Sequence, residues 1–283
     1  MNFLILGGSG YLGSKITKNL LHNGHNIVCT KRQTSNLFRL KDVINQIDMI
    51  PASVDAVETV CKFINVDYVI NAVCNYGRSS LLNDDVIEAN INFPVKVLNT
   101  AVKHGIKKYL TIGTGLPDSF NMYSFSKRIF SELGRFYVEK YDITFNCLLL
   151  EMFYGADEPV DRFIPSVVRK MINGEDVETT IGTQFRDIIS VRDVVTAVMM
   201  VIESSLKGYN QISVGTGVAP TVSQIIDFIW EETGRMSKIR KGVIPMREDE
   251  PDCVADTTLL KSLGSWEPIS WRDGLRTMIS ELK

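Results

Sequence analysis

The sequence has few of the residues that build metal centres and disulfide frameworks. Its five cysteines are scattered along 283 residues with no C-x-x-C pair, and it contains three histidines. An odd number of scattered cysteines argues against both a set of paired disulfides and a structural zinc site. We therefore expect no metal and a reducing compartment.

A strong charge of one sign and long apolar runs are also missing. The formal net charge is -2, which gives no basic field for nucleic acid. No apolar stretch reaches the roughly 20 residues of a membrane span, and residues 1–7 lack the basic start of a signal peptide. These features predict a cytoplasmic protein that binds neither nucleic acid nor membranes, and that must bind an anionic ligand through local arginines.

What the sequence does contain is an alternation of short runs rich in β-branched residues with longer amphipathic stretches. The expected strands are residues 3–6, 26–30, 67–73, 108–112 and 144–150. Continuous apolar runs are typical of strands covered on both faces, and helices between them imply right-handed crossovers. The sequence therefore predicts an α/β fold with a doubly wound parallel sheet.

The rhythm changes after residue 153, where a loop rich in proline and aspartate precedes a short helix from about residue 164. Residues 187–191 and 211–214 are expected to form later strands that return to the main sheet. We predict a dinucleotide-binding domain over 1–158 and 183–216, and a smaller C-terminal substrate-binding lobe over 159–182 and 217–283. No flexible linker separates them, so we expect them to share a cleft.

A glycine-rich segment lies between the first strand and the helix that follows it. Such glycines let backbone amides and the positive helix end approach a pyrophosphate closely. In this strand, turn and helix context they predict a Rossmann-like dinucleotide site, although a turn that only packs strand on helix is the alternative. The expected cofactor contacts are Gly7, Gly10, Tyr11, Leu12 and Gly13.

The end of the second strand bears on the choice of cofactor. A ribose 2'-hydroxyl favours a carboxylate at this place, whereas a 2'-phosphate favours cations. The sequence has Lys31 and Arg32 here and no acid. NADP(H) is therefore favoured over NAD(H), with two solvated surface charges as the alternative.

Tyr123 and Lys127 are four residues apart in a helical stretch, so they share one helix face. A neighbouring ammonium and the positive nicotinamide are expected to favour the phenolate, which makes the tyrosine able to exchange a proton. In a reduction, Tyr123 would protonate the carbonyl oxygen while Thr114 polarises it. Lys127 would also hold the nicotinamide ribose. The same spacing alone is also common in surface pairs.

Together these residues resemble the extended short-chain dehydrogenase/reductases, the NAD(P)-dependent epimerase/dehydratase family that acts on nucleotide sugars. Further resemblances are Asn71-Ala72, Asn90, Tyr154-Gly155, Arg186-Asp187, Asp193 and Gly215-Thr216-Gly217. The resemblance implies that Thr114, Tyr123 and Lys127 are catalytic. It also implies cofactor contacts at Asn71, Ala72, Tyr123 and Lys127, and a nucleotide-diphosphate sugar held by Arg186, Arg247 and Glu250. A salt bridge of Arg186 to Asp187 or Asp193 is the alternative.

The choice of reaction rests on what the site lacks. Sugar dehydratases that resemble this chain carry an Asp-Glu pair directly after the catalytic threonine, whereas this sequence has Gly115 and Leu116. Within the family the chain is most similar to 4-ketoreductases of the CDP-paratose and CDP-abequose synthase type, which implies that Tyr76 and Arg78 face the sugar or its diphosphate. It departs from the wider family at Leu149, where an arginine is common, and at Met152, often an asparagine.

The resemblance therefore implies NADPH-dependent reduction of the 4-keto group of a CDP- or dTDP-linked 4-keto-6-deoxy or 3,6-dideoxy hexose. The product would serve O-antigen or another cell-surface polysaccharide. A nucleotide-sugar 4-epimerase with NAD is one alternative, and a non-catalytic dinucleotide-binding sensor is another. Helices expected at residues 85–103 and 123–139 would form a four-helix homodimer contact or remain solvated faces.

Overall fold

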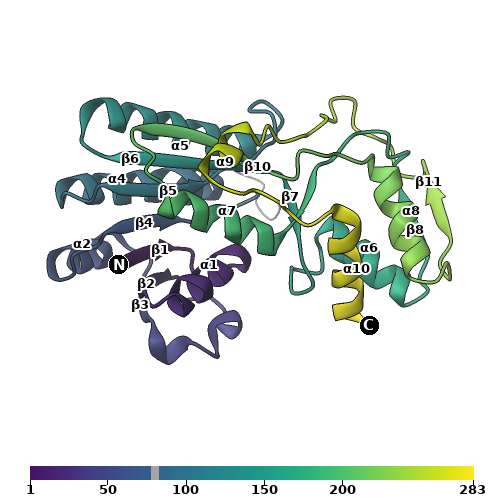
Figure 1. The fold of residues 1–283 in the computed structure, drawn as a ribbon, viewed down its shortest axis with the longest axis horizontal. Helices are drawn as coiled ribbons and strands as arrows, with labels where there is room; N and C mark the ends of the chain where they lie inside the picture. The colour runs from purple at the N-terminus through teal and green to yellow at the C-terminus, as the bar shows by residue number, and fades with distance from the viewer. Residues whose placement is uncertain (78–82) are drawn as a thin grey trace. The chain divides into compact units, whose positions relative to one another are not determined.

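The computed structural model describes residues 1–77 and 83–283 (Figure 1). Its chain divides into two compact units. The N-terminal unit comprises Met1–Leu149 and Val198–Ile212, and the C-terminal unit comprises Leu150–Ala197 and Ser213–Lys283. These bounds differ from the lobes expected from the sequence at residues 150–158, 183–197 and 213–216, so the functional division into lobes stays a prediction.

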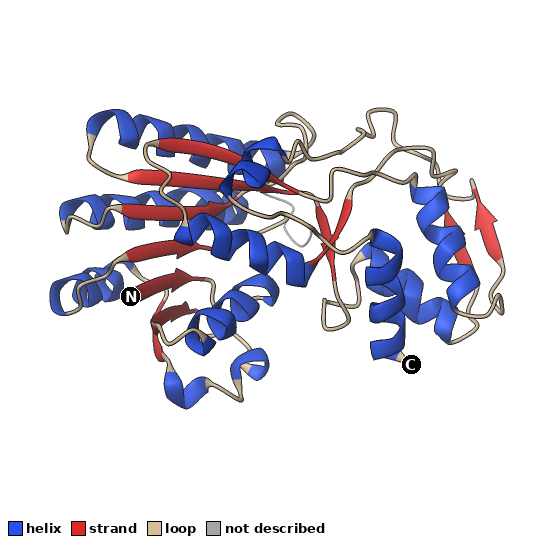
Figure 2. Ribbon diagram, in the orientation of Figure 1, coloured by secondary structure: helices blue, strands red, loops and turns tan. Residues whose placement is uncertain are grey.

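A seven-stranded sheet in the order β10-β6-β5-β4-β1-β2-β3 forms the centre of the N-terminal unit (Figure 2). Its strands are β1 (Asn2–Leu6), β2 (Asn26–Lys31), β3 (Asp48–Pro51), β4 (Tyr68–Asn71), β5 (Lys108–Ile112), β6 (Thr144–Leu150) and β10 (Tyr209–Val214). In this order, each pair of neighbouring strands between β6 and β3 is parallel. The predicted doubly wound parallel sheet is confirmed.

Helices cover both faces of this sheet, as the alternating pattern predicts. They are α1 (Tyr11–His22), α2 (Val54–Phe63), α3 (Asp84–Ile87), α4 (Phe93–Lys103), α5 (Met122–Lys140) and α7 (Val191–Glu203). The chain between α3 and α4 is a π-helical turn, Glu88–Asn92, where the sequence predicts an uninterrupted helix over residues 85–103. Such turns are rare and occur frequently near functional sites.

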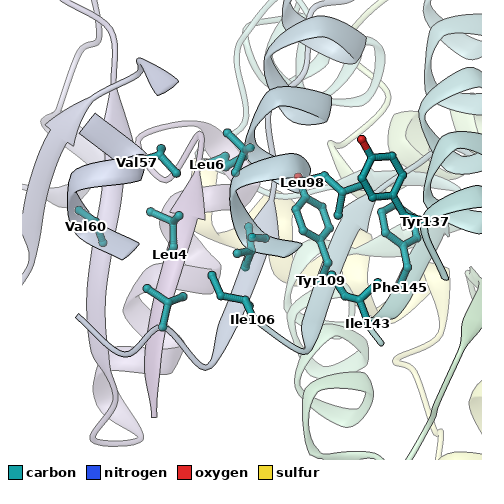
Figure 3. Close-up of a cluster of buried hydrophobic side chains, with 14 of the residues drawn as sticks. Leu4, Leu6, Val57, Val60, Leu98, Ile106, Tyr109, Tyr137, Ile143 and Phe145 are labelled. Atoms are coloured by element: carbon teal, nitrogen blue, oxygen red, sulfur yellow. The ribbon is translucent and has the colours of Figure 1, made fainter. Parts of the chain in front are cut away.

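One hydrophobic core lies between the sheet and helices α2, α4 and α5 (Figure 3). The rings of Tyr109 on β5 and Phe145 on β6 stack with centroids 5.3 Å apart. Helix α5 packs so closely that a Cβ at Gly134 would lie 2.3 Å from the Phe145 ring. This contact holds the helix that carries Tyr123 and Lys127 at a fixed position against the sheet.

The C-terminal unit has its own core, built mainly from α6 (Phe163–Ile172), α8 (Val222–Glu232) and α10 (Trp271–Leu282). A short helix, α9 (Thr258–Leu263), precedes α10. Two small parallel sheets complete the unit. One pairs β7 (Met152–Tyr154) with β9 (Ile188–Ser190), and the other pairs β8 (Val177–Thr179) with β11 (Ile239–Lys241).

The expectation that both later strands return to the main sheet is half right. Strand β10 pairs beside β6 in the main sheet, but β9 pairs with β7. The backbone N–H of Glu151, directly after β6, donates to the carbonyl of Val214 at the end of β10, at 3.0 Å. Beyond this bond the chain leaves the main sheet, and β7 takes β9 as its partner.

Candidate active site

The strand order places the glycine loop at the point where the direction of winding reverses. Strand β1 lies between β2 and β4, and ligands of doubly wound sheets bind beyond the carboxyl ends of the strands at this point. Gly7 follows β1 with φ +75°, and a Cβ there would lie 3.1 Å from the backbone of Ala72, which follows β4. The two predicted cofactor segments therefore meet.

The glycine loop is packed so closely that it leaves no space for a side chain at Gly13. A Cβ at Gly13 would lie 2.2 Å from the Gly7 carbonyl oxygen, and the Gly10 N–H donates to that oxygen at 3.0 Å. Gly10 is the N-cap of α1 and has no side chain that could bond the amides of the helix start. The Leu12 side chain is buried and Tyr11 is half-buried at this helix start. This cradle of amides fits the pyrophosphate of a dinucleotide.

Lys31 and Arg32 lie at the end of β2 with exposed side chains. Within the described chain, no ion pair joins either side chain to a carboxylate. The preceding residue, Thr30, is buried and its hydroxyl accepts a hydrogen bond from the Gly7 N–H at 3.3 Å. The end of β2 is thus tied to the glycine loop, with both cations directed to solvent beside it.

Thr114 and Tyr123 come together because a short capped loop joins β5 to α5. Asn121 and Ser124 form a capping box at the start of α5, and the Ser124 hydroxyl also donates to the Asp118 carbonyl at 3.2 Å. Tyr123 is thereby placed in the first turn of the helix, where its phenol hydrogen-bonds the Thr114 hydroxyl.

Lys127 is one turn further along α5 and is only 5% exposed. Its ammonium donates to the carbonyl oxygens of Val73 at 2.7 Å and Ile112 at 2.9 Å. These carbonyls follow β4 and end β5, so the lysine spans the carboxyl ends of two strands. Burial lowers the pKa of Lys127, while the neighbouring Cys74 and Cys147 raise it. This placement excludes the surface pair that the spacing alone permits.

Burial acts on the protonation of Tyr123, and the effect expected of a bound nicotinamide stays a prediction. Burial is the largest cause and raises the pKa of the phenol well above its usual value, and the nearby Cys74 and Tyr76 raise it further. The hydrogen bond from Thr114 lowers the pKa but does not outweigh burial. Desolvation penalises the charged form, so Tyr123 is a neutral phenol in this state. A neutral phenol is the form that can donate a proton to a carbonyl oxygen.

The loop after β4 brings Cys74 and Tyr76 against the catalytic candidates. The ring of Tyr76 lies 4.7 Å from that of Tyr123, centroid to centroid. The buried Asn90 amide, on the π-helical turn, accepts from the Asn75 N–H at 2.8 Å and donates to its carbonyl at 2.9 Å. Sequence reasoning missed the contact of Cys74, because a loop's direction is not encoded in spacing. Arg78, predicted to contact substrate, lies outside the described residues.

Asn71 contributes by ordering this edge of the sheet. Its buried amide donates to the Thr111 hydroxyl at 3.1 Å and accepts from the Val73 N–H at 3.2 Å. Both side-chain ends are therefore committed to the fold. Asn71 fixes the direction of the chain that carries Ala72 and the Val73 carbonyl bonded by Lys127.

Arg186 and Glu250, two of the predicted substrate residues, lie together in the C-terminal unit. The Arg186 guanidinium is 4% exposed and donates to Glu250, to the Pro251 carbonyl and, at 2.9 Å, to the Phe185 carbonyl. The sequence offered Asp187 or Asp193 as salt-bridge partners, but the ion pair forms with Glu250. Arg247 lies in an exposed loop three residues before Glu250.

Asp187 orders the segment with Gly215, Thr216 and Gly217. Its fully buried carboxylate accepts hydrogen bonds from the Thr216 hydroxyl at 2.6 Å and from the Gly217 N–H at 2.8 Å. A Cβ at Gly215 would lie 2.4 Å from an Asp187 oxygen, so glycine is required. The Asp187 carboxylate therefore holds this segment of the C-terminal unit in place.

Within residues 1–77 and 83–283, no group of three or more His, Cys, Asp or Glu side chains is arranged to hold a metal ion. In the same residues, none of the helices combines the length and the apolar character that crossing a membrane requires.

Comparison with known proteins gives consistent matches. A model of the NAD dependent epimerase/dehydratase family matches residues 3–215. CDP-abequose synthase of Salmonella muenchen is 29% identical, over 98% of this chain and 96% of that protein. The crystal structure of UDP-glucose 4-epimerase from Thermotoga maritima with UDP-glucose has a TM-score of 0.88 at 22% identity, over 99% of this chain and 98% of that one. The crystal structure of UDP-glucose 4-epimerase from Thermus thermophilus in complex with NAD has a TM-score of 0.85 at 19% identity, over 100% of this chain and 99% of that one. These matches confirm the family resemblance seen in the sequence.

Proposed function

Because the chain belongs to the NAD dependent epimerase/dehydratase family of oxidoreductase-type enzymes, we propose that it reduces the 4-keto group of a nucleotide-activated sugar with NADPH. The substrate is a CDP- or dTDP-linked 4-keto-6-deoxy or 3,6-dideoxy hexose, destined for O-antigen or a related cell-surface polysaccharide and made in the cytoplasm. The similarity to CDP-abequose synthases over nearly the whole chain supports this substrate class. Homodimer formation stays a prediction from the sequence.

The observation that carries the proposal is the placement of Tyr123 beside Thr114, on the helix that also carries buried Lys127. When bound, the nicotinamide supplies the hydride. Thr114 then hydrogen-bonds the carbonyl oxygen and stabilises the developing negative charge. Tyr123 donates its proton to that oxygen, so that the ketone becomes an alcohol.

The Lys127 ammonium stabilises the phenolate that Tyr123 leaves behind, since an opposite charge nearby favours the ionised form. Its bonds to the Val73 and Ile112 carbonyls hold the ammonium at the sheet edge. The glycine loop between β1 and α1 binds the pyrophosphate. In the C-terminal unit, Arg186 binds the substrate diphosphate through its planar fork of donors.

A second candidate is a nucleotide-sugar 4-epimerase with NAD. It is favoured by curated relatives such as the UDP-glucose 4-epimerase of Lactobacillus helveticus, 23% identical over 95% of this chain. Against it stand Lys31 and Arg32, neither of which forms an ion pair with a carboxylate among the described residues. A non-catalytic sensor is a weaker candidate, because a sensor has no use for the arrangement of Thr114, Tyr123 and Lys127.

The test is a panel of CDP- and dTDP-linked 4-keto-6-deoxy and 3,6-dideoxy hexoses with NADPH, with products identified by NMR. The proposal expects stoichiometric oxidation of NADPH with a 4-keto sugar nucleotide and none with its 4-hydroxy counterpart. Interconversion of two 4-hydroxy sugar nucleotides without a change in NADPH would establish the epimerase instead. Cofactor binding with no turnover across the panel would favour the sensor.

The cofactor preference gives a separate prediction. Replacing both Lys31 and Arg32 by alanine removes two charge-assisted contacts to a 2'-phosphate, and should lower kcat/KM for NADPH by about tenfold to a hundredfold. The kcat/KM for NADH should change little, because NADH has no such phosphate. Steady-state kinetics with both cofactors measure the ratio, and Lys140→Ala, an exposed lysine at the end of α5, is the matched control. An equal loss for the two cofactors would contradict the assignment.

A further inference from the structure

Arg186 lies in a buried cluster that holds more carboxyl groups than cations. Arg186, Asp187 and Glu151 are 4%, 0% and 9% exposed, and Glu250 pairs with the guanidinium. If all three carboxyls were ionised, the cluster would hold three negative charges against one positive charge. Unpaired buried charge is costly, and a group in that position neutralises by taking up a proton. One of the three carboxyls is therefore the proton acceptor of the cluster.

Asp187 is poorly suited to hold that proton. One of its oxygens accepts hydrogen bonds from the N–H and the hydroxyl of Thr216, at 2.9 and 2.6 Å. The other accepts from the N–H groups of Gly217 and Ala255, at 2.8 and 3.3 Å. A proton on either oxygen would displace one of these four donors. Glu250 already faces the guanidinium, which leaves Glu151.

Glu151 is fixed at the end of β6 by its backbone bond to the Val214 carbonyl. Burial is the main cause that raises the pKa of its carboxyl to about 7, the negative charge of Asp187 adds to the rise, and Arg186 opposes it. Burial raises the pKa of the nearby Cys253 thiol to about 11, and the charge of Glu151 adds to that rise. Glu250 and Asp252 also act on that thiol, which stays neutral near pH 7.

We propose that Glu151 takes up a proton from solvent when an anionic sugar nucleotide binds at Arg186, so that substrate affinity is coupled to a carboxyl outside the Thr114, Tyr123 and Lys127 set. The inference rests on the proposed role of Arg186 in binding the diphosphate. The diphosphate brings negative charge to the one cation that opposes protonation of Glu151. The ionised carboxylate and one solvent proton then give a neutral acid, and no bond in the ligand changes.

The direction of the pH dependence follows from this coupling. Below about pH 7 Glu151 already holds its proton in the free protein, so affinity is at its maximum and no proton is taken up. Above that pH Glu151 must take up a proton from solvent when the ligand binds, and affinity falls until Glu151 is ionised in the complex as well. For a shift of about one pKa unit on binding, the loss of affinity is about tenfold.

The experiment is calorimetric titration of the whole chain with CDP-glucose, or with dTDP-glucose if that binds more tightly. Both are diphosphate diesters with no ionisation of the diphosphate near neutral pH, and neither has a ketone to reduce. Titrations at about pH 7.5 in PIPES and in Tris, which differ in ionisation enthalpy, give the number of protons taken up. We expect a fractional uptake, together with a Kd that rises by about tenfold between about pH 6.5 and about pH 8.5. Equal heats in the two buffers and a flat Kd would overturn the inference.

Two variants assign the proton. Glu151→Gln copies the protonated acid, so its binding should be independent of buffer and of pH, while Glu175→Gln, an exposed glutamate in the same unit, should retain the uptake. Uptake that persists in Glu151→Gln would refute the assignment. If Arg186→Lys leaves CDP-glucose affinity unchanged, the proposed role of Arg186 fails. If Arg186→Lys weakens CDP-glucose affinity while the wild-type chain takes up no proton on binding, Arg186 keeps its proposed role and only the coupling to Glu151 fails.

The folded chain holds the Glu151 proton more tightly than the unfolded chain, whose pKa is near the ordinary value of 4.5. The stabilising contribution is therefore fully present below that value and is lost as pH rises through about 7. Glu151→Gln keeps the neutral side chain at every pH. It is expected to fold at least as stably as the wild type above pH 7, which keeps the binding test interpretable.

Discussion

Tyr123→Phe is expected to lower kcat for reduction of the sugar ketone by about two to four orders of magnitude, the range that one positioned proton donor supplies. The phenol is the hydrogen-bond partner of Thr114, and burial raises its pKa further above neutral pH. Phenylalanine keeps the ring that packs near Tyr76 but removes the proton. Stopped-flow or steady-state oxidation of NADPH measures the loss, and KM for the sugar nucleotide should change far less than kcat.

The control for this variant is Tyr141→Phe, which removes a phenol from an exposed residue just beyond α5. It should retain full activity. The Kd for NADPH, measured by fluorescence, should stay within a few-fold of the wild type in both variants, because Tyr123 contributes only part of the cofactor site. Undiminished turnover in Tyr123→Phe would refute its role as the proton donor.

Arg186→Lys is expected to give the second largest effect, a rise of about tenfold to several hundredfold in Kd for the sugar nucleotide. Truncating one partner of a buried, hydrogen-bonded charge pair costs about 2–5 kcal/mol, and lysine recovers part of this through its charge. Lysine cannot copy the fork that donates to Glu250 and to the Phe185 and Pro251 carbonyls. In the enzymatic assay the loss should appear mainly in KM for the sugar nucleotide.

The matched control is Arg192→Lys, since Arg192 pairs with Glu281 on an exposed surface of the same unit. Exposed ion pairs contribute little, so its kinetics should remain unchanged. Thermal unfolding of both variants shows whether the fold survives. A stable Arg186→Lys protein with unchanged affinity for the sugar nucleotide would remove Arg186 from the substrate site.

The sequence predicts the parts of the fold that depend on hydrophobic periodicity. Strands β5 and β6 lie at residues 108–112 and 144–150, as expected, because both are apolar runs buried on two faces. Helix α1 ends beside Asn23 and Gly24, and Gly24 has the positive φ that a left-handed cap requires. Each of these signals is local in the chain.

Elements that depend on distant partners were missed. Strand β3, Asp48–Pro51, has no apolar run, because it is an edge strand with half-exposed residues and a terminal proline. Residues 187–191 contain a strand, as expected, but its partner is β7. No spacing rule distinguishes β7 from the main sheet, since its partner β9 is distant in the chain.

The candidate site shows the same limit. The spacing of Tyr123 and Lys127 predicts a shared helix face, and the structure brings both against the loop that carries Cys74. The sequence did not indicate the burial that raises the pKa of Tyr123, because desolvation depends on what surrounds the phenol. The alternative for Arg186 was a salt bridge to Asp187 or Asp193, and spacing could not indicate its ion pair with Glu250, which is 64 residues away in the chain. The roles of these residues in catalysis stay predictions.

The central claim is that hydride passes permanently from NADPH to C4 of the sugar while Tyr123 supplies the proton. The most direct test supplies NADPH that carries deuterium as the transferred hydrogen of the nicotinamide ring, and follows the sugar by NMR. The account predicts one deuterium at C4 of a 4-hydroxy product for each NADPH oxidised, with at least a hundredfold slower transfer in Tyr123→Phe. A sugar that changes configuration with no deuterium at C4 and no NADPH consumed would contradict it.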